Sequence, residues 1–173
     1  MSDSTRSRTS AAVLVLLKKQ ETSLEVLLME RSATVKTHQS QVAFPGGGTE
    51  PHDENDPVRT ALRECFEEVG VQPDLVKVLK TLPPLPTLTS GFFVHPVLGE
   101  LDSEKLHELN LVLDPNEVAH AEWVSLDALF ETKRVENGFP VFDWHGLDLK
   151  KRKVWGLTAI ILELIFNSDT KTL

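Results

Sequence analysis

The stretch over residues 46–71 constrains this sequence most, because it joins a run of glycines to a short helix. Asp56 is placed as an N-cap, and Pro57 follows at the first helical position, where its missing N–H is harmless. Gly70 is placed to end the helix. The sequence therefore predicts a helix over residues 57–69.

A helical wheel divides this predicted helix into two faces. One face carries the apolar residues Val58, Leu62, Cys65 and Val69. The roughly opposite face carries three carboxylates, Glu64, Glu67 and Glu68. Like charges three or four residues apart on a helix repel by about 0.2–0.5 kcal/mol per pair. The carboxylate face therefore needs either a bound cation or a well-solvated surface, and the helix by itself allows both.

The segment before the helix favours the cation. Residues 43–48 read Ala-Phe-Pro-Gly-Gly-Gly, which places a rigid proline before three glycines that let a backbone or a ligand approach closely. Mg²⁺ prefers oxygen ligands and is usually held by one or two carboxylates together with water and substrate phosphates. A glycine turn that leads into a carboxylate helix is therefore the layout of a divalent-cation site.

The same stretch resembles the Nudix box. In that motif a glycine, five residues, a glutamate and seven further residues precede Arg-Glu-hydrophobe-x-Glu-Glu-x-Gly-hydrophobe. The matching core consists of Arg63, Glu64, Glu67, Glu68, Gly70 and Val71. Gly48 and Glu54 fit the first spacing, but eight residues rather than seven separate Glu54 from Arg63. The core of the motif is thus complete, and the departure concerns Glu54.

Residues 27–47 resemble the signature of the coenzyme A pyrophosphatase branch of the Nudix enzymes, which runs from Leu-Leu-Thr-x-Arg-Ser to Phe-Pro-Gly-Gly. The spacing is kept, while Met29 stands for threonine, Lys36 for a second arginine and Ser40 for glycine. The change at Lys36 matters most, because arginine grips a phosphate with two hydrogen bonds whereas lysine is a point charge. Residues 82–99 are also similar to the corresponding region of that branch.

The resemblance implies an α+β fold, the Nudix fold, in which a mixed β-sheet is sandwiched between α-helices. It implies divalent-metal-dependent hydrolysis of a pyrophosphate bond in coenzyme A or its thioesters, which gives phosphopantetheine and adenosine 3′,5′-bisphosphate. Mg²⁺ or Mn²⁺ is the expected cofactor, and a small nucleotide such as coenzyme A is the expected partner.

Two alternatives to this activity stay open. The first keeps the chemistry but acts on ADP-ribose, a nucleoside diphosphate sugar or another nucleotide. The second is a non-catalytic Nudix module that only binds a nucleotide. The second is disfavoured because such modules are expected to lose box carboxylates, and all three are present here.

Within this resemblance, Glu64 and Glu68, one helical turn apart, are the expected metal ligands, and Glu67 is a third. Arg63 is expected to pair with these carboxylates and to orient them. The general base is either Glu117 or a box glutamate, and Glu117 is favoured because Nudix enzymes often place a further carboxylate there. These five residues form the predicted catalytic set.

Substrate phosphates are expected to meet a polar loop over residues 31–41, which lies next to the glycine turn. The candidate contacts in the loop and the turn are Arg31, Lys36, His38, Gly46 and Gly47. A basic cluster at this place also suits the 3′-phosphate of coenzyme A.

The rest of the chain shows alternating strand and helix patterns. The expected strands cover residues 11–17, 24–29, 75–79, 92–98 and 118–123, with a hairpin-like unit at 139–146. A short helix over residues 126–130 follows the Ser125 cap, and an apolar helix over 155–166 packs against the sheet. The sequence thus predicts a single Nudix hydrolase domain over residues 10–173, behind a disordered tail at residues 1–9.

Composition excludes several kinds of function. The 18 basic and 26 acidic residues give a formal net charge of −8, which argues against binding to nucleic acid or to anionic membranes. No stretch approaches the roughly 18–20 apolar residues that a membrane span requires. Cys65 is the only cysteine and lies on the apolar face of the predicted helix, which fits a cytoplasmic protein without disulfides. Many Nudix proteins act as dimers, so the resemblance leaves a homodimer open.

Overall fold

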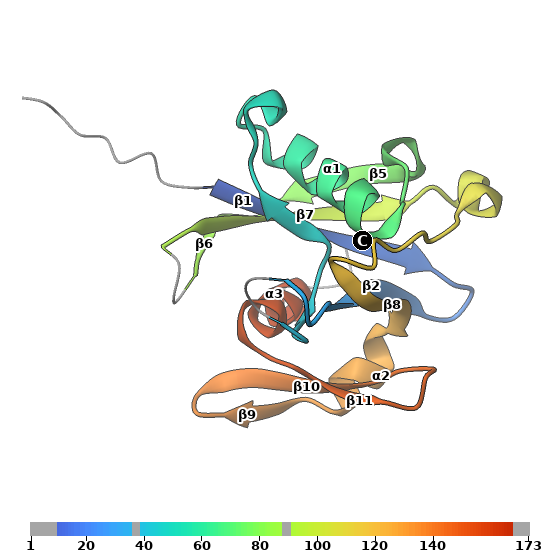
Figure 1. Cartoon of the computed structure of the whole chain (residues 1–173). Coiled ribbons are helices and arrows are strands. Elements are labelled where there is room, and N and C mark those ends of the chain that lie inside the picture. The colour runs from blue at the N-terminus through green and yellow to red at the C-terminus, as the bar shows by residue number, and fades with distance from the viewer. Residues whose placement is uncertain (1–9, 36–38, 88–90, 168–173) are drawn as a thin grey trace, which may run out of the picture.

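A mixed β-sheet forms the centre of the molecule. The computed structural model describes residues 10–35, 39–87 and 91–167. In it, β1 (Ser10–Lys19) pairs in parallel with β7 (Phe93–Leu101) and antiparallel with β2 (Leu24–Arg31) and β4 (Gly46–Gly48). The combination of parallel and antiparallel pairs confirms the predicted mixed sheet (Figure 1).

Within the described residues, further strands and three helices complete the fold. The same sheet includes β3 (Val42–Ala43) and β8 (Val118–Ser125) on β2, and β5 (Val76–Thr81) and β6 (Leu85–Pro86) on β7. A separate sheet consists of β9 (Arg134–Glu136), β10 (Phe139–His145) and β11 (Lys151–Val154). The helices are α1 (Pro57–Val69), α2 (Leu126–Glu131) and α3 (Gly156–Asn167), and the 3-10 turns are η1 (Pro51–Asp53), η2 (Pro73–Leu75) and η3 (Ser103–Glu108). Across the described ranges, no helix is both long and apolar enough to span a membrane.

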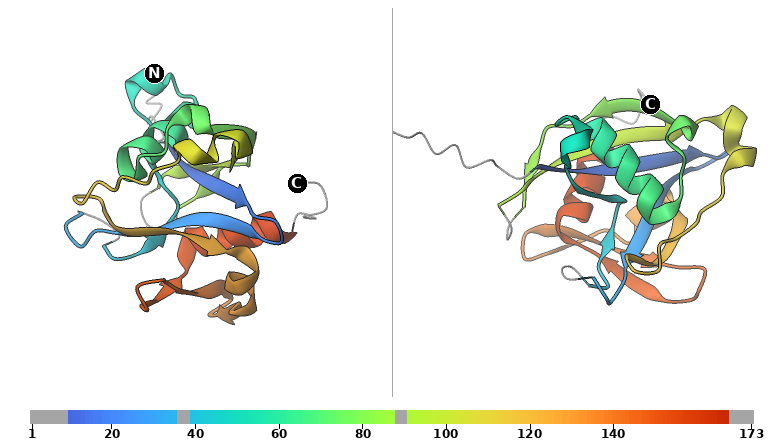
Figure 2. Two further views of the ribbon diagram at one scale, coloured as in Figure 1. Left: turned by 90° about the vertical axis from the view of Figure 1, so that its right-hand side faces the viewer. Right: turned by 45° about the horizontal axis from the view of Figure 1, so that its top comes forward.

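Alternate residues of β1 enter two separate hydrophobic cores, because successive side chains of a strand point to opposite faces of the sheet. Leu14 and Leu16 belong to the core that includes the apolar face of α1. Val15 and Leu17 belong to the core that includes α3 and β10. The mixed sheet is therefore covered by α1 on one face and by α3 with the smaller sheet on the other, as the two views of Figure 2 show. This arrangement confirms the predicted sandwich.

Helix α1 begins and ends at the predicted residues. The Asp56 side chain accepts a hydrogen bond from the N–H of Val58 at 2.9 Å. Gly70 adopts a φ of 77° and donates its N–H to the carbonyl of Phe66. A Cβ at Gly70 would also lie 2.9 Å from the nitrogen of Val112. Glycine therefore ends the helix both because of its backbone conformation and because the next segment passes so close.

The glycine run forms β4, a strand that the sequence does not predict because glycine is depleted in strands. Gly46 approaches β1 so closely that a Cβ there would lie 2.3 Å from the carbonyl oxygen of Ala12. On its other side, β4 packs against α1. The glycine run thus lies between the central strand and the carboxylate helix, and this position creates the candidate site.

Strands β9 and β11 are also absent from the sequence-based expectation. Each segment has a single β-branched residue, Val135 in β9 and Val154 in β11, and all its other residues are charged. Such a composition does not mark a strand, because strands are enriched in β-branched and aromatic residues. Ion pairs join them across the sheet, with Lys153 bound to Glu136 and both Arg134 and Lys151 bound to Asp143. Charge pairing rather than apolar alternation therefore identifies these strands.

Candidate active site

Glu68 is the most deeply buried carboxylate of α1, with 2% of its surface exposed. The N–H of Gly46 donates to Glu68 Oε2 at 2.8 Å, and Arg31 Nη1 lies 3.4 Å from Oε1. Burial raises the pKa of Glu68 to about 8, and the negative charges of Glu64 and Glu117 add to this rise. The hydrogen bond from Gly46 and the positive charge of Arg31 lower the pKa of Glu68, but by less than burial raises it. An additional positive charge beside Glu68 is therefore favourable.

Glu64 lies one helical turn before Glu68 and faces the same glycine strand. A Cβ on Gly47 would lie 2.5 Å from Glu64 Oε1, so the carboxylate rests directly on the backbone of β4. Burial raises the pKa of Glu64, and the neighbouring Arg63 opposes this rise. Two carboxylates of raised pKa therefore meet at the glycines of β4.

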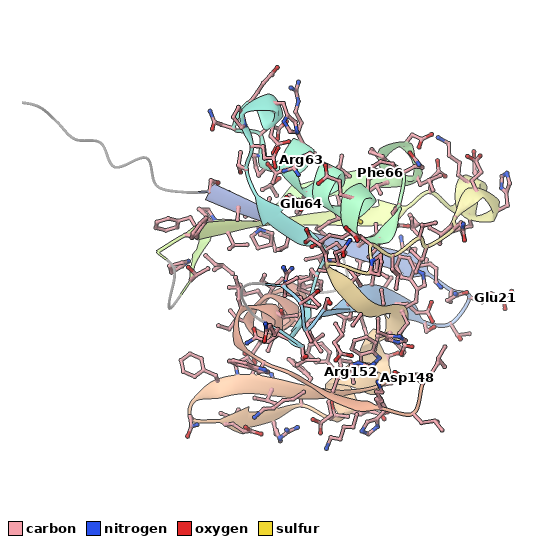
Figure 3. The ribbon with its side chains drawn as sticks, in the orientation of Figure 1. Glu21, Arg63, Glu64, Phe66, Asp148 and Arg152 are labelled. Carbon is pink, nitrogen blue, oxygen red and sulfur yellow. The ribbon has the colours of Figure 1, made fainter. Side chains whose placement is uncertain are left out.

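Arg63, which lies beside Glu64 (Figure 3), connects the exposed side of this carboxylate pair to the segment that precedes the helix. Its Nη1 donates to Glu64 Oε1 and to Glu67 Oε2, both at 3.0 Å. Its Nε and Nη2 donate to the two carboxylate oxygens of Asp53 at 3.0 and 2.9 Å, and Nη2 also donates to the carbonyl of Gly48. The hydrogen bonds to Asp53 raise the pKa of Arg63, which keeps the guanidinium charged. Arg63 thus fixes the orientation of Glu64 and Glu67.

Asp53 is the site residue that the sequence analysis misses. It is 2% exposed, and in addition to Arg63 it accepts hydrogen bonds from Thr60 Oγ1 at 3.0 Å and from the N–H of Glu50 at 2.9 Å. The hydrogen bonds from Arg63 hold the pKa of Asp53 well below its usual range. Asp53 is therefore a fully ionised, buried anchor for the arginine.

Glu54, which the box spacing singles out, lies outside the site. It follows η1 with a φ of 55°, its side chain is 71% exposed, and it pairs with an arginine on the outer surface of α1. Asp53 takes the place beside Arg63 instead. The sequence contains a signal for Asp53, since five residues separate Gly47 from Asp53, just as five separate Gly48 from Glu54.

Glu67 lies on the solvent side of α1, with 54% of its side chain exposed. Within the segments that the structure describes, no three side chains of His, Cys, Asp or Glu converge closely enough to hold a metal ion. Glu64 and Glu68 supply two hard oxygen donors, which suits a cation that keeps several waters and binds substrate phosphates. These two residues fit a divalent cation, and Glu67 as a further ligand stays a prediction.

Glu117 approaches the site from the turn that precedes β8. Its charge raises the pKa of both Glu64 and Glu68, so the carboxylate lies within electrostatic reach of both. The turn is fixed on two sides. The N–H of Asp114 donates to the carbonyl of Glu68 at 3.0 Å, and the N–H of Ser32 donates to the carbonyl of Glu117 at 2.8 Å.

The structure brings three of the predicted substrate contacts to the paired carboxylates. Arg31 ends β2, and its Nη1 points at the buried carboxylate of α1 with 19% of the side chain exposed. Gly46 and Gly47 lie in β4 against the same carboxylates. Lys36 and His38 lie outside the described residues, so their contacts with phosphate stay predictions.

Comparison with known proteins relates this geometry to a family. The model of the NUDIX domain matches residues 6–145 of the chain. The Nudix hydrolase NudL of Cronobacter sakazakii, which is itself described as uncharacterized, is 36% identical over 187 residues. That alignment covers 99% of this chain and 88% of NudL.

Solved Nudix structures share the fold. An Ap4A hydrolase of C. elegans, in a binary complex, matches 71% of this chain and 84% of its own with a TM-score of 0.55 and 22% identity. The NUDIX domain of Shewanella oneidensis NrtR, solved with ADP ribose, matches 73% of this chain and 78% of its own with a TM-score of 0.54 and 19% identity. Because the family model spans most of the sequence and NudL is similar along nearly all of it, the chain belongs to the Nudix hydrolase family, whose members act on pyrophosphate bonds and generally use divalent metals.

Proposed function

We propose that this protein hydrolyses the pyrophosphate bond of coenzyme A or of its thioesters, with Mg²⁺ or Mn²⁺ as the cofactor. The observation that carries the hydrolysis is the pairing of Glu64 and Glu68 at the glycine strand, beside Arg63. The choice of coenzyme A is supported by the resemblance of residues 27–47 to the coenzyme A branch. The products are then phosphopantetheine and adenosine 3′,5′-bisphosphate.

The paired carboxylates suit the main difficulty of this reaction, which is that anionic phosphate oxygens repel an incoming nucleophile. When bound, a divalent cation neutralises these oxygens and lowers the pKa of its water. Glu64 and Glu68 are the proposed ligands. Arg63 holds Glu64 in position, and Asp53 holds Arg63.

Glu117 is the proposed general base. It lies within electrostatic reach of both ligands but belongs to a different segment, so it is available to accept a proton from the attacking water. Arg31 is the proposed contact for a substrate phosphate, because a guanidinium binds phosphate with two hydrogen bonds. Lys36 and His38 are proposed to meet the 3′-phosphate of coenzyme A.

Hydrolysis of a panel of compounds tests both the chemistry and the substrate. The panel contains coenzyme A, an acyl-coenzyme A, dephospho-coenzyme A, ADP-ribose, a UDP-sugar, Ap4A and a nucleoside triphosphate, each with Mg²⁺ or Mn²⁺ and with products identified by mass. ADP-ribose and Ap4A are included because two structural neighbours are described with them. Glu68→Gln tests the buried carboxylate, and Glu131→Gln, at an exposed glutamate of α2, is its matched control.

We expect coenzyme A or its thioester to be cleaved best, Glu68→Gln to lose at least about 100-fold in kcat, and Glu131→Gln to match the wild type. Preferential cleavage of ADP-ribose or a sugar nucleotide would retain the Nudix chemistry and reject coenzyme A. Absence of turnover on the whole panel would favour a binding module. A cytoplasmic location and a homodimer also stay predictions, which cell fractionation and light scattering test.

A further inference from the structure

The turn that carries Glu117 has a defined shape at the C-terminal end of α1. The N–H of Glu117 donates to the carbonyl of Asp114 at 3.1 Å. The backbone and side-chain nitrogens of Asn116 donate to Asp114 Oδ1 at 2.9 and 3.0 Å. Asp114 is itself bonded to the backbone of Glu68. One side of the turn is therefore tied to the residue that carries the buried carboxylate.

Ser32 and Thr34 hold the other side of the turn. The N–H of Ser32 donates to the carbonyl of Glu117 at 2.8 Å, and Thr34 Oγ1 donates to the carbonyl of Asn116 at 3.0 Å. The two hydroxyl oxygens lie 2.8 Å apart, and Ser32 is buried. Consecutive carbonyls of the turn are thus bound by the segment that follows β2, which lies beside the turn in the views of Figure 2.

The direction of the bond between the two hydroxyls follows from their hydrogens. A threonine hydroxyl has a single hydrogen, and Thr34 donates it to Asn116. Ser32 must therefore donate its own hydroxyl hydrogen to Thr34 Oγ1, while its oxygen accepts the N–H of Thr34 at 3.3 Å. The result is a directed chain from Ser32 through Thr34 to the backbone of the turn, in which each bond polarises the next.

We propose that Thr34 is a positioning residue for Glu117 and that Ser32 supports it through this chain of hydroxyls. The inference rests on the proposed function, in which Glu117 is the general base. The side chain of Glu117 is exposed, so its place is set by the backbone that carries it. A base must lie within hydrogen-bond reach of the proton that it takes, and misplacement by about 1 Å can reduce a rate by about 100-fold.

Two substitutions separate the hydroxyl of Thr34 from its packing. Thr34→Val keeps the shape and removes the hydroxyl, whereas Thr34→Ser keeps the hydroxyl and removes the methyl group. We expect Thr34→Val to lower kcat about tenfold with less than a twofold change in KM, and Thr34→Ser to stay within about twofold of the wild type. If the methyl group of Thr34 mattered through packing instead, Thr34→Ser would lower kcat more than Thr34→Val. Thr81→Val, at an exposed threonine of β5, is the matched control.

A double variant shows whether Thr34 acts through Glu117. When Thr34→Val is added to Glu117→Gln, kcat should change by less than twofold relative to Glu117→Gln alone. A further tenfold loss there would overturn the proposal, because the effect would then be independent of Glu117. If Glu117→Gln alone keeps wild-type kcat, the base assignment fails and the positioning role fails with it. If Glu117→Gln is impaired but Thr34→Val is not, only the positioning role fails.

Hydrogen exchange of the substrate-free protein gives a reading that does not depend on catalysis. Thr34→Val should speed exchange of the N–H groups of Ser32, Glu117 and Val118 by about tenfold or more, while the interior of α1 exchanges as in the wild type. Unchanged exchange in the turn would contradict the proposal.

Discussion

Burial of the Glu68 carboxylate makes the metal-free protein sensitive to pH. Its pKa is about 8 in the folded protein, against an ordinary value of 4.5. Between these values the folded protein keeps a proton that the unfolded chain has released. The stabilising contribution of the protonated carboxyl is therefore complete below pH 4.5 and is lost as the pH rises to about 8.

Glu68→Gln should remove the loss of stability at high pH, because an amide cannot ionise. In the absence of divalent cations, we expect the variant to exceed the wild type in free energy of unfolding by on the order of a few kcal/mol at pH 9, and to differ least near pH 4.5. Urea unfolding at the two pH values measures the difference. Mn²⁺ should then stabilise the wild type and not the variant. An equal difference at both pH values would show that the ionisation of Glu68 is not responsible.

Arg31 places a fixed positive charge beside the Glu68 carboxylate. Its replacement should therefore strengthen the binding of a cation and weaken the binding of the substrate. The guanidinium repels a cation at Glu68, yet the proposed substrate phosphate needs it. We expect Arg31→Met to lower the dissociation constant for Mn²⁺ several-fold in the substrate-free protein, measured by titration calorimetry, and to raise KM. Arg59→Met, on the exposed surface of α1, should do neither. Weaker Mn²⁺ binding by Arg31→Met would refute the electrostatic role.

The short strand β4 sets how closely α1 can approach the sheet. Gly47 touches the carboxylate of Glu64, whereas a Cβ on the next residue, Gly48, would meet nothing within 4 Å. The two glycines therefore differ in function although they are neighbours in one run.

Replacement of each glycine by alanine tests this difference. Gly47→Ala should displace the Glu64 carboxylate and reduce kcat by at least about tenfold with an unchanged circular dichroism spectrum, while Gly48→Ala should keep most of the activity. Steady-state kinetics of the two variants at saturating Mg²⁺ gives the comparison. Equal losses would indicate that the glycines act through the conformation of the backbone rather than through the space around Glu64.

Only part of the carboxylate site is encoded by features that are local in the sequence. Helix α1 is predictable because its cap residues and apolar face are local features. The position of Arg63 is predictable as well, but its anchor is not. Asp53 reaches Arg63 because η1 turns the chain, and this geometry decides between Asp53 and Glu54 where the spacing of residues cannot.

A buried arginine joins the two sheets. Arg152 in β11 is 6% exposed, and its Nε donates to Glu30 in β2 at 2.7 Å. Figure 3 shows Arg152 beside Asp148, and its other two nitrogens donate to both oxygens of that carboxylate at 2.8 and 2.7 Å. The guanidinium also lies 4.7 Å from the ring centroid of Trp144. The smaller sheet is thus fixed to the central sheet by charge as well as by the apolar core.

Arg152→Met should therefore destabilise the protein by on the order of 3 kcal/mol, because it leaves carboxylates without their buried partner. Urea unfolding followed by tryptophan fluorescence measures this change. Arg134→Met, which removes an arginine from the exposed face of the smaller sheet, should have a much smaller effect. If the two variants lose the same free energy of unfolding, the contacts of Arg152 between the sheets do not stabilise the protein more than a surface ion pair does.

The overall sandwich follows from sequence because its central strands and helices are long and apolar. The charged strands β9 and β11 and the glycine strand β4 do not follow, since pairing with distant segments rather than their own composition makes them strands. The same holds for the site. Glu64, Glu67 and Glu68 can be identified by position, but their different exposure, from 2% to 54%, depends on what packs against α1.

The space around β4 also has a consequence for variation among related chains. A side chain at Gly46 would enter β1, and one at Gly47 would displace a carboxylate, whereas one at Gly48 would extend into open space. Related chains with the same chemistry are therefore expected to carry various residues at the position of the third glycine and to keep glycine at the first two. The Phe-Pro-Gly-Gly signature ends at Gly47, and the next residue, Gly48, is the first glycine of the run that has room for a side chain.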